Sequence, residues 1–158
     1  GPDFACAVNN GQPCAWGATK ALKALAAVPV ERRNSAVQRA LAQGAEFLLR
    51  YDLAKADYPT TGNISSTWFK LGFPLSYWSD VLERLGVLVA LGHGGDARLA
   101  EAYAWLLGKQ DAGGRWKLEN SLNGKMWVDI EKKGKPSKWV TLRALRVVKG
   151  VAESAAAM

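Results

Sequence analysis

Three tryptophans recur at nearly equal intervals along the chain and constrain its fold more than any other feature. Trp16, Trp78 and Trp139 are 62 and 61 residues apart, and apolar residues follow each of them at helical spacing. Phe47 and Trp105, 58 residues apart, occupy matching places in the helical segments that come next. Repeats that consist of two helices bury their apolar faces against neighbouring repeats. The sequence therefore predicts a helical-repeat protein.

We expect one all-α domain over residues 1–150. The repeats span about residues 14–62, 76–120 and 137–150, and the third repeat ends after its first helix, which gives about two and a half helix pairs. With 158 residues and 49% hydrophobic residues, the chain is long enough for one substantial core. Residues 151–158 are rich in alanine and are expected to form a frayed tail.

Apolar periodicity, prolines and capping residues set the expected helix boundaries. In the third predicted helix, Glu83 and Arg84 are expected to form the exposed strip. Gly150 is expected to end the fifth helix. The five helices are predicted over 15–28, from 34 or 35 to about 51, over 76–91, from 96 to about 107, and over 138–149.

A small β-hairpin is expected near residues 115–131. Asn123-Gly124 is a strong signal for a tight turn, and apolar residues such as Trp116 and Trp127 flank it on both sides. The pattern here differs from the helical spacing of the rest of the chain. The hairpin would therefore connect the second repeat to the third.

The end of the fourth predicted helix contains the most specific local motif. Its residues read WLLGKQDAGGRW, in which an aromatic-aliphatic helix end precedes Gln110, a short spacer, Gly114, one residue and Trp116. This spacing resembles the glutamine-tryptophan repeat of squalene cyclases and the related repeat of protein prenyltransferases. The amide of the Gln can cap carbonyls at the helix end, while the indole lies over the neighbouring helix end.

Segments around Trp16, Asp80 and Trp139 also look like those of bacterial squalene-cyclase-like repeat proteins of unassigned function, so the resemblance spans roughly residues 6–150. It implies a partial α/α toroid, in which inner helices line a cavity and outer helices surround them. A complete ring of this family has about twice as many helix pairs. The resemblance therefore implies either the remainder of a longer chain or an open arc that forms a homo-oligomer.

The resemblance also suggests where chemistry could occur. Squalene-type cyclases protonate their substrate with an acidic cluster that this chain lacks, and Asp80 is the nearest candidate acid. An aspartate at a helix start is more often a partner of the helix dipole, and we favour that interpretation. Aromatic side chains at the starts of inner helices line the cavity in cyclases. The candidates here are Trp16, Tyr77, Trp78 and Trp139, for which a role as core anchors is the favoured alternative.

Protein prenyltransferases use a zinc ion held by Asp, Cys and His, so the cysteines and the histidine are candidate ligands. Cys6, Cys14 and His93 match no zinc spacing that we recognise, and the spacing disfavours a metal site. Buried free thiols are the favoured interpretation of Cys6 and Cys14, ahead of a shared metal and a disulfide. His93 lies in a glycine-rich turn, where an exposed polar role is the favoured one.

The net charge of +7 is concentrated in residues 115–149, which contain ten Lys or Arg against three acidic residues. Lys135, Lys138 and Arg143 are the candidate anion-binding residues, because a diphosphate could also reach backbone donors at the helix that starts after Ser137. A solvated basic surface is the favoured alternative. Nucleic acid is a weaker option, since no recognised nucleic-acid motif accompanies the charge.

Two function classes remain after these observations. We expect a terpenoid-cyclase-like or prenyltransferase-like domain that binds an extended apolar, isoprenoid-like ligand in an aromatic groove. The alternative is a noncatalytic helical-repeat module for proteins or peptides. Whether the chain is an enzyme is left open. No apolar run is long enough to span a bilayer and no secretory leader opens the sequence, so a soluble, cytoplasmic protein is expected.

Overall fold

The computed structural model describes residues 6–60 and 62–157, and these residues are mostly helical. Within them there are five α-helices and no β-strand, so the all-α prediction is confirmed. None of the described helices is long and apolar enough to cross a membrane. The α-helices are α1 (Ala15–Ala26), α2 (Ser35–Leu49), α3 (Val81–Leu88), α4 (Ala100–Leu107) and α5 (Lys138–Ala156).

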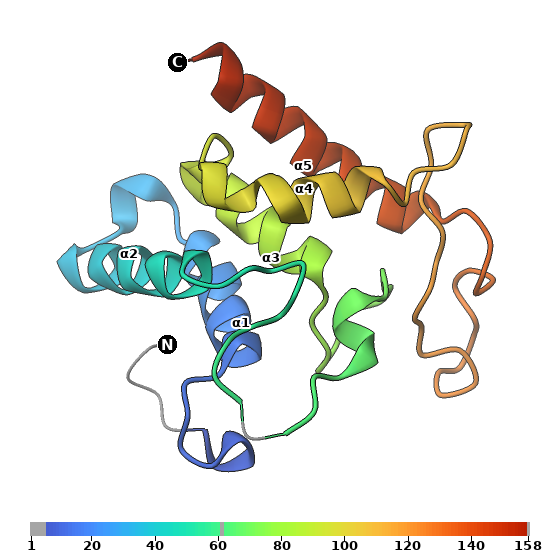
Figure 1. Ribbon diagram of the computed structural model, residues 1–158, viewed down its shortest axis with the longest axis horizontal. Helices are drawn as coiled ribbons and strands as arrows, with labels where there is room; N and C mark the ends of the chain where they lie inside the picture. Colours follow the sequence, from blue (N-terminus) through green and yellow to red (C-terminus); the bar gives the residue numbers. More distant parts are fainter. Residues whose placement is uncertain (1–5, 61, 158) are drawn as a thin grey trace.

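Helix α3 lies at the centre of the molecule, between α1 and α5 (Figure 1). The other two helices pack outside this row, α2 against α1 and α4 against α3. The long connection from α4 to α5 lies at the opposite side of the molecule from α2 (Figure 1). Helices α1, α3 and α5 thus form an inner row, and α2 and α4 form outer partners.

Side-chain caps explain where most of the helices begin. Asn34, Asp80 and Ser137 each accept a hydrogen bond from the backbone N–H three residues later, which satisfies an otherwise unpaired donor in the first turn. Asp96 caps a 3-10 turn, Ala97–Leu99, that continues into α4. Of the two residues at which the second helix was expected to start, 34 and 35, Asn34 is the cap, and the caps at Asp96 and Ser137 are as expected.

The three repeat tryptophans do not occupy equivalent places. Trp16 and Trp139 are the second residues of α1 and α5, whereas Trp78 comes two residues before Asp80, the cap of α3. Helix α3 begins at Val81 rather than Ser76 because the cap stands at residue 80. The regular spacing of the tryptophans is thus a sequence pattern that the helix starts do not follow.

A buried tryptophan follows each outer helix. The indole N–H of Trp68 donates to the carbonyl of Leu53 at 2.8 Å, and that of Trp116 donates to the carbonyl of Leu106 at 2.7 Å. Both side chains are fully buried. Each indole therefore satisfies a main-chain carbonyl at or after the end of an outer helix while it fills the core.

The hairpin expected near residues 115–131 is wrong. Residues 108–137, all of which the structure describes, contain isolated bridges and no strand. Trp116 and Leu118 are buried, and the backbone of Lys117 bridges to Pro136 rather than to residues 127–130. Packing of two side chains in the core overrides the turn signal, and the residues around 124–131 form a projecting loop.

The prediction of a frayed tail is also wrong, since α5 continues to Ala156. Gly150 does not end the helix. It lets α5 approach the π-helical turn after α3, Val89–His93, because a Cβ at Gly150 would lie 2.3 Å from Cγ1 of Val89. The Ser154 hydroxyl donates to the Gly150 carbonyl, and Val151 packs against the core.

Candidate functional site

One candidate site is a groove of about 640 Å³ between the three inner helices α1, α3 and α5. Its apolar surface comes from small and branched side chains, so its walls can approach an elongated apolar molecule closely. Basic groups from α1 and α5 stand beside this apolar surface. The lining residues are Lys23, Ala26, Ala27, Leu82, Glu83, Gly86, Val87, Val89, Ala90, Arg143, Arg146, Val147, Lys149, Gly150 and Glu153.

Three of the four cations in the groove are paired with carboxylates. Lys23 contacts Glu83 at 2.9 Å, and the same kind of pair joins Arg143 to Asp80 at 2.8 Å and Lys149 to Glu153 at 3.6 Å. Arg146 has no carboxylate partner within the described part of the chain. It is exposed on α5, one turn beyond Arg143. Arg146 is therefore the cation that is available to an anionic ligand.

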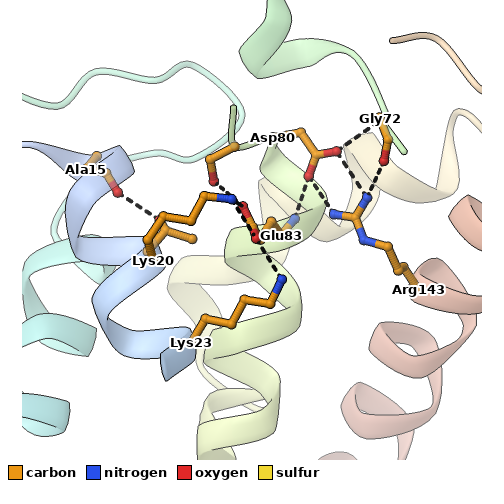
Figure 2. A network of polar contacts seen from close by, with 9 residues as sticks. Ala15, Lys20, Lys23, Gly72, Asp80, Glu83 and Arg143 are labelled. Atoms are coloured by element: carbon orange, nitrogen blue, oxygen red, sulfur yellow. Dashed lines mark hydrogen bonds and ion pairs between the residues drawn. The ribbon is translucent and has the colours of Figure 1, made fainter. Parts of the chain in front are cut away.

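Glu83 forms the main carboxylate of the groove and is buried, which corrects the expectation that it lies on an exposed strip. It accepts hydrogen bonds from Lys20, Lys23 and Ser79 at 2.7–3.0 Å (Figure 2). Burial alone would raise the pKa of Glu83, but the donors from Lys20, Ser79 and Lys23 lower it below its ordinary value of 4.5. Glu83 is thus a negative group at neutral pH and no proton donor.

Asp80 connects three elements and lies outside the lining of the groove. Its two oxygens accept from the backbone N–H of Gly72 at 2.9 Å and of Glu83 at 2.7 Å. Arg143 of α5 pairs with Asp80 and donates to the carbonyl of Gly72 at 2.7 Å (Figure 2). The residue therefore caps α3 and fixes α5 to the segment before it.

Arg84 is also buried, against the sequence-based expectation of exposure. Its side chain is 0% exposed, and its three guanidinium nitrogens have no hydrogen-bond partner among the described residues. The guanidinium carbon lies 3.0 Å from the ring centroid of Trp68. Desolvation lowers the pKa of Arg84 to about 9, against the opposing charge of Asp80. The negative charge of Asp80 and the ring face of Trp68 thus both compensate for this charge.

The four aromatic residues expected to line a cavity lie elsewhere. Trp16 meets Tyr77 edge-on at 5.8 Å between ring centroids, and Trp139 stacks on Phe73 at 5.2 Å. Trp78 is half-buried. These side chains join the starts of α1 and α5 to the segment before α3, and the groove lining contains none of the four.

The candidate metal ligands are not brought together. Among residues 6–60 and 62–157, no three His, Cys, Asp or Glu side chains cluster as a metal site would require. Cys6 and Cys14 are free thiols, and the sulfur of Cys14 accepts from the backbone N–H of Gly17 at the start of α1. His93 stands at the end of the π-helical turn.

The expected anion site at the start of α5 is already occupied by the protein's own groups. The Ser137 side chain accepts from Val140, while the carboxylate of Glu131 accepts from the backbone N–H of Lys138 and from the Ser137 hydroxyl. Lys135 and Lys138 are exposed there. Of the three predicted residues, Arg143 alone lines the groove.

Sequence reasoning included Arg146 only as one of the basic residues of region 115–149, and it missed the apolar floor of the groove. A usable signal was present, because Arg143, Arg146 and Lys149 recur every third residue and so lie on neighbouring turns of α5. In the Gln110 motif, the structure gives the carbonyl-capping role to the indole of Trp116.

No protein-family model, curated protein or solved structure matches this chain. The family resemblance that the motifs suggest therefore stays a proposal. Function has to be inferred from the groove and from the exposed surfaces of the molecule.

Proposed function

We propose that this protein is a binding domain whose inner-helix groove holds an elongated apolar molecule with an anionic head, such as an isoprenoid diphosphate. The observation that supports this most directly is Arg146, which has no carboxylate partner among the described residues. It lies beside an apolar floor made by Leu82, Val87, Val89 and Val147. An apolar ligand gains about 25 cal/mol for each Å² that it buries there. Arg146 would add a charge-assisted hydrogen bond to the head.

The dimensions of the groove suit one such molecule. Its volume of about 640 Å³ lies inside the range of roughly 300–1,000 Å³ that is typical of small-molecule sites. The basic groups stand along α1 and α5, and the floor comes mostly from α3 and the turn after it. A ligand with one polar end would therefore lie along the floor, with its head toward α5.

Binding rather than turnover is the role that the polar groups support. Protonation of a polyene requires an acid with a proton to donate. Glu83 is held in its charged form by two lysines, and both oxygens of Asp80 accept hydrogen bonds from other elements. These carboxylates organise the inner helices around the groove.

We further propose that the chain forms an arc of an α/α toroid like that of squalene cyclases and protein prenyltransferases. The inner row of α1, α3 and α5 with α2 and α4 outside it supports this proposal. The buried Trp116 of the glutamine-tryptophan-like motif also supports it. The isoprenoid character of the ligand is part of the same proposal.

Isothermal titration calorimetry of the full chain with farnesyl diphosphate and with farnesol tests the proposal. We expect both to bind, the diphosphate more tightly. Arg146→Ala should weaken diphosphate binding by about tenfold or more and leave farnesol unchanged, because it removes a charge-assisted hydrogen bond. Arg39→Ala is the matched control, since Arg39 is exposed on α2 away from the groove.

A second variant separates the apolar contribution from the charge. Ala90→Trp places a large side chain at an exposed position in the groove lining and should abolish binding of both compounds. If neither compound gives a heat of binding in the titration or shifts the midpoint of thermal unfolding, the groove does not bind isoprenoids. Binding that Ala90→Trp leaves intact would place the ligand elsewhere.

An exposed apolar stripe on α5 favours a second candidate, a helical module for protein partners. Trp139, Leu142 and Leu145 are spaced three residues apart and are 38–46% exposed. Neighbouring turns of one helix therefore present apolar side chains to solvent. In a helix-pair array this is a surface on which another helix would pack, from a longer chain or from a second copy.

A further inference from the structure

A projecting loop between α4 and α5 has large apolar side chains at its tip. Trp127 is 104% exposed, more than in an extended reference peptide, and Val128 and Ile130 are 69% and 45% exposed. Most exposed tryptophans in proteins lie at least partly against a neighbour, because the ring is the largest apolar side chain. An indole that none of the described residues covers marks a surface for another molecule.

The loop is held in place by hydrogen bonds at its base. The side chain of Asn123 donates to the carbonyl of Glu131 at 2.8 Å, and the backbone N–H of Gly124 donates to Asp129 at 2.9 Å. The Glu131 carboxylate is bound in turn to Ser137 and Lys138 at the start of α5. Hydrogen bonds within the protein therefore hold the apolar tip in its position.

Lysines surround the apolar tip on both sides. Lys125 precedes it, and Lys132, Lys133 and Lys135 follow it, all with exposed side chains. Asp129 and Glu131 offset part of this charge, and with four lysines against these two carboxylates the formal charge of residues 125–135 is +2. The residues from 125 to 135, hereafter the lysine-flanked tip, thus combine exposed apolar side chains with exposed lysines on both sides of them in the sequence.

We propose that the lysine-flanked tip inserts into the surface of an anionic lipid bilayer. Indole rings favour the membrane interface, where the ring is desolvated and its N–H stays near water. Lysines near an anionic surface gain about 1 kcal/mol each from the headgroups, and their stems can cover apolar surface. The tip thus matches an anionic membrane in both the apolar and the charged part of its surface.

Shape and size favour a bilayer over other partners. A stable protein interface buries about 800 Å² on each side, which a loop tip with three apolar side chains does not provide. Single-stranded nucleic acid is bound by several stacked aromatic rings along a basic groove. This tip has one aromatic ring, and its other apolar side chains are aliphatic.

Vesicle flotation with the full chain tests the proposal. We expect the protein to float with vesicles of equal parts phosphatidylcholine and phosphatidylglycerol and to stay behind with pure phosphatidylcholine. Raising the salt from about 0.1 M to about 1 M should release it, because the Debye length falls from about 10 Å to about 3 Å. Trp127→Ala should weaken vesicle binding about tenfold, since the buried ring is lost.

Further variants separate insertion from loss of folding. Each of Lys132→Ala and Lys133→Ala should weaken binding about fivefold. Val128→Ser should reduce binding, whereas Val30→Ser, at a valine that is equally exposed at 71% on another surface, should not. Circular dichroism should show unchanged helix content in all these variants, because the altered side chains are exposed.

Three results would overturn the proposal. The first is flotation that is absent or equal on neutral and anionic vesicles. The second is a Trp127-dependent binding of a single-stranded oligonucleotide that is tighter than vesicle binding. The third is self-association of the protein that Trp127→Ala abolishes, which would assign the tip to a second copy of the chain.

Discussion

At Arg84 the fold places a positive charge where water does not reach. The side chain is fully buried, its nitrogens have no hydrogen-bond partner among the described residues, and the ring of Trp68 covers it. An unpaired charge at such a site costs several kcal/mol, of which a ring face returns about 2. We therefore expect Arg84→Met, which keeps the volume and removes the charge, to raise the free energy of unfolding by about 1–3 kcal/mol.

Urea unfolding at two pH values checks this prediction. The pKa of Arg84 is lowered from 12.5 to about 9, so between these values the unfolded chain binds more protons than the folded one. The free energy of unfolding of the wild type therefore rises with pH above about 9 relative to that of Arg84→Met. The difference in free energy of unfolding between the two proteins is smaller at pH 10 than at pH 7. A variant that is less stable at pH 7 would show that Arg84 has a favourable partner.

Burial of Glu83 and Arg84 could not be predicted from their residue types. Charged residues at neighbouring positions of an apolar helix normally mark its solvent side. Here α1 supplies two lysines to one of them and the connection after α2 supplies Trp68 to the other. The two lysines and Trp68 are all more than ten residues away in sequence, so local periodicity contains no information about them.

At the scale of elements, the close contact between α5 and the turn after α3 depends on glycines. A Cβ at Gly94 would lie 2.8 Å from the carbonyl oxygen of Gly150 and 2.5 Å from the Ser154 hydroxyl. The first of these atoms is backbone and cannot move aside. We expect Gly94→Ala to lower the free energy of unfolding by about 1–3 kcal/mol through overpacking.

Gly62→Ala is the matched control for Gly94→Ala, because a Cβ at Gly62 meets no atom within 4 Å. It should leave stability unchanged or raise it by up to about 1 kcal/mol through the lower entropy of the unfolded chain. Thermal unfolding followed by circular dichroism compares the two variants. Equal midpoints for both would mean that α5 does not pack this closely on the turn.

Helices could be predicted where a capping residue and an apolar periodicity coincide, whereas the prediction of a hairpin failed. Asp96 and Ser137 were identified as caps because apolar residues at helical spacing follow each of them, and Asn34 was one of two candidates for the same reason. The structure shows all three as caps. For the hairpin, the turn signal at Asn123-Gly124 is local, whereas the competing burial of Trp116 beneath α4 is not. Gly150 was misread for the same reason, since its contact with Val89 joins distant segments.

At the scale of the whole molecule, the inner row of helices follows from the order of packing along the chain. Each inner helix is followed by a partner that covers its outer side, except α5, which extends to Ala156 with its stripe of Trp139, Leu142 and Leu145 exposed. That the chain is mostly helical was predictable from its apolar periodicity. The groove was not, because its lining depends on how closely three helices approach one another.

The exposed stripe leads to a prediction about association. Helix α5 is 19 residues long and about 28 Å from end to end, so a second copy could pack along it. We expect analytical ultracentrifugation of the wild type to show concentration-dependent dimers. The double variant Leu142→Glu and Leu145→Glu should stay monomeric with unchanged helix content, because two carboxylates would be desolvated in the interface.

Leu107→Glu, at a similarly exposed leucine on α4, should still dimerise. A wild type that remains monomeric at all concentrations, or a Leu107→Glu variant that is monomeric too, would show that the α5 stripe does not join copies of this chain.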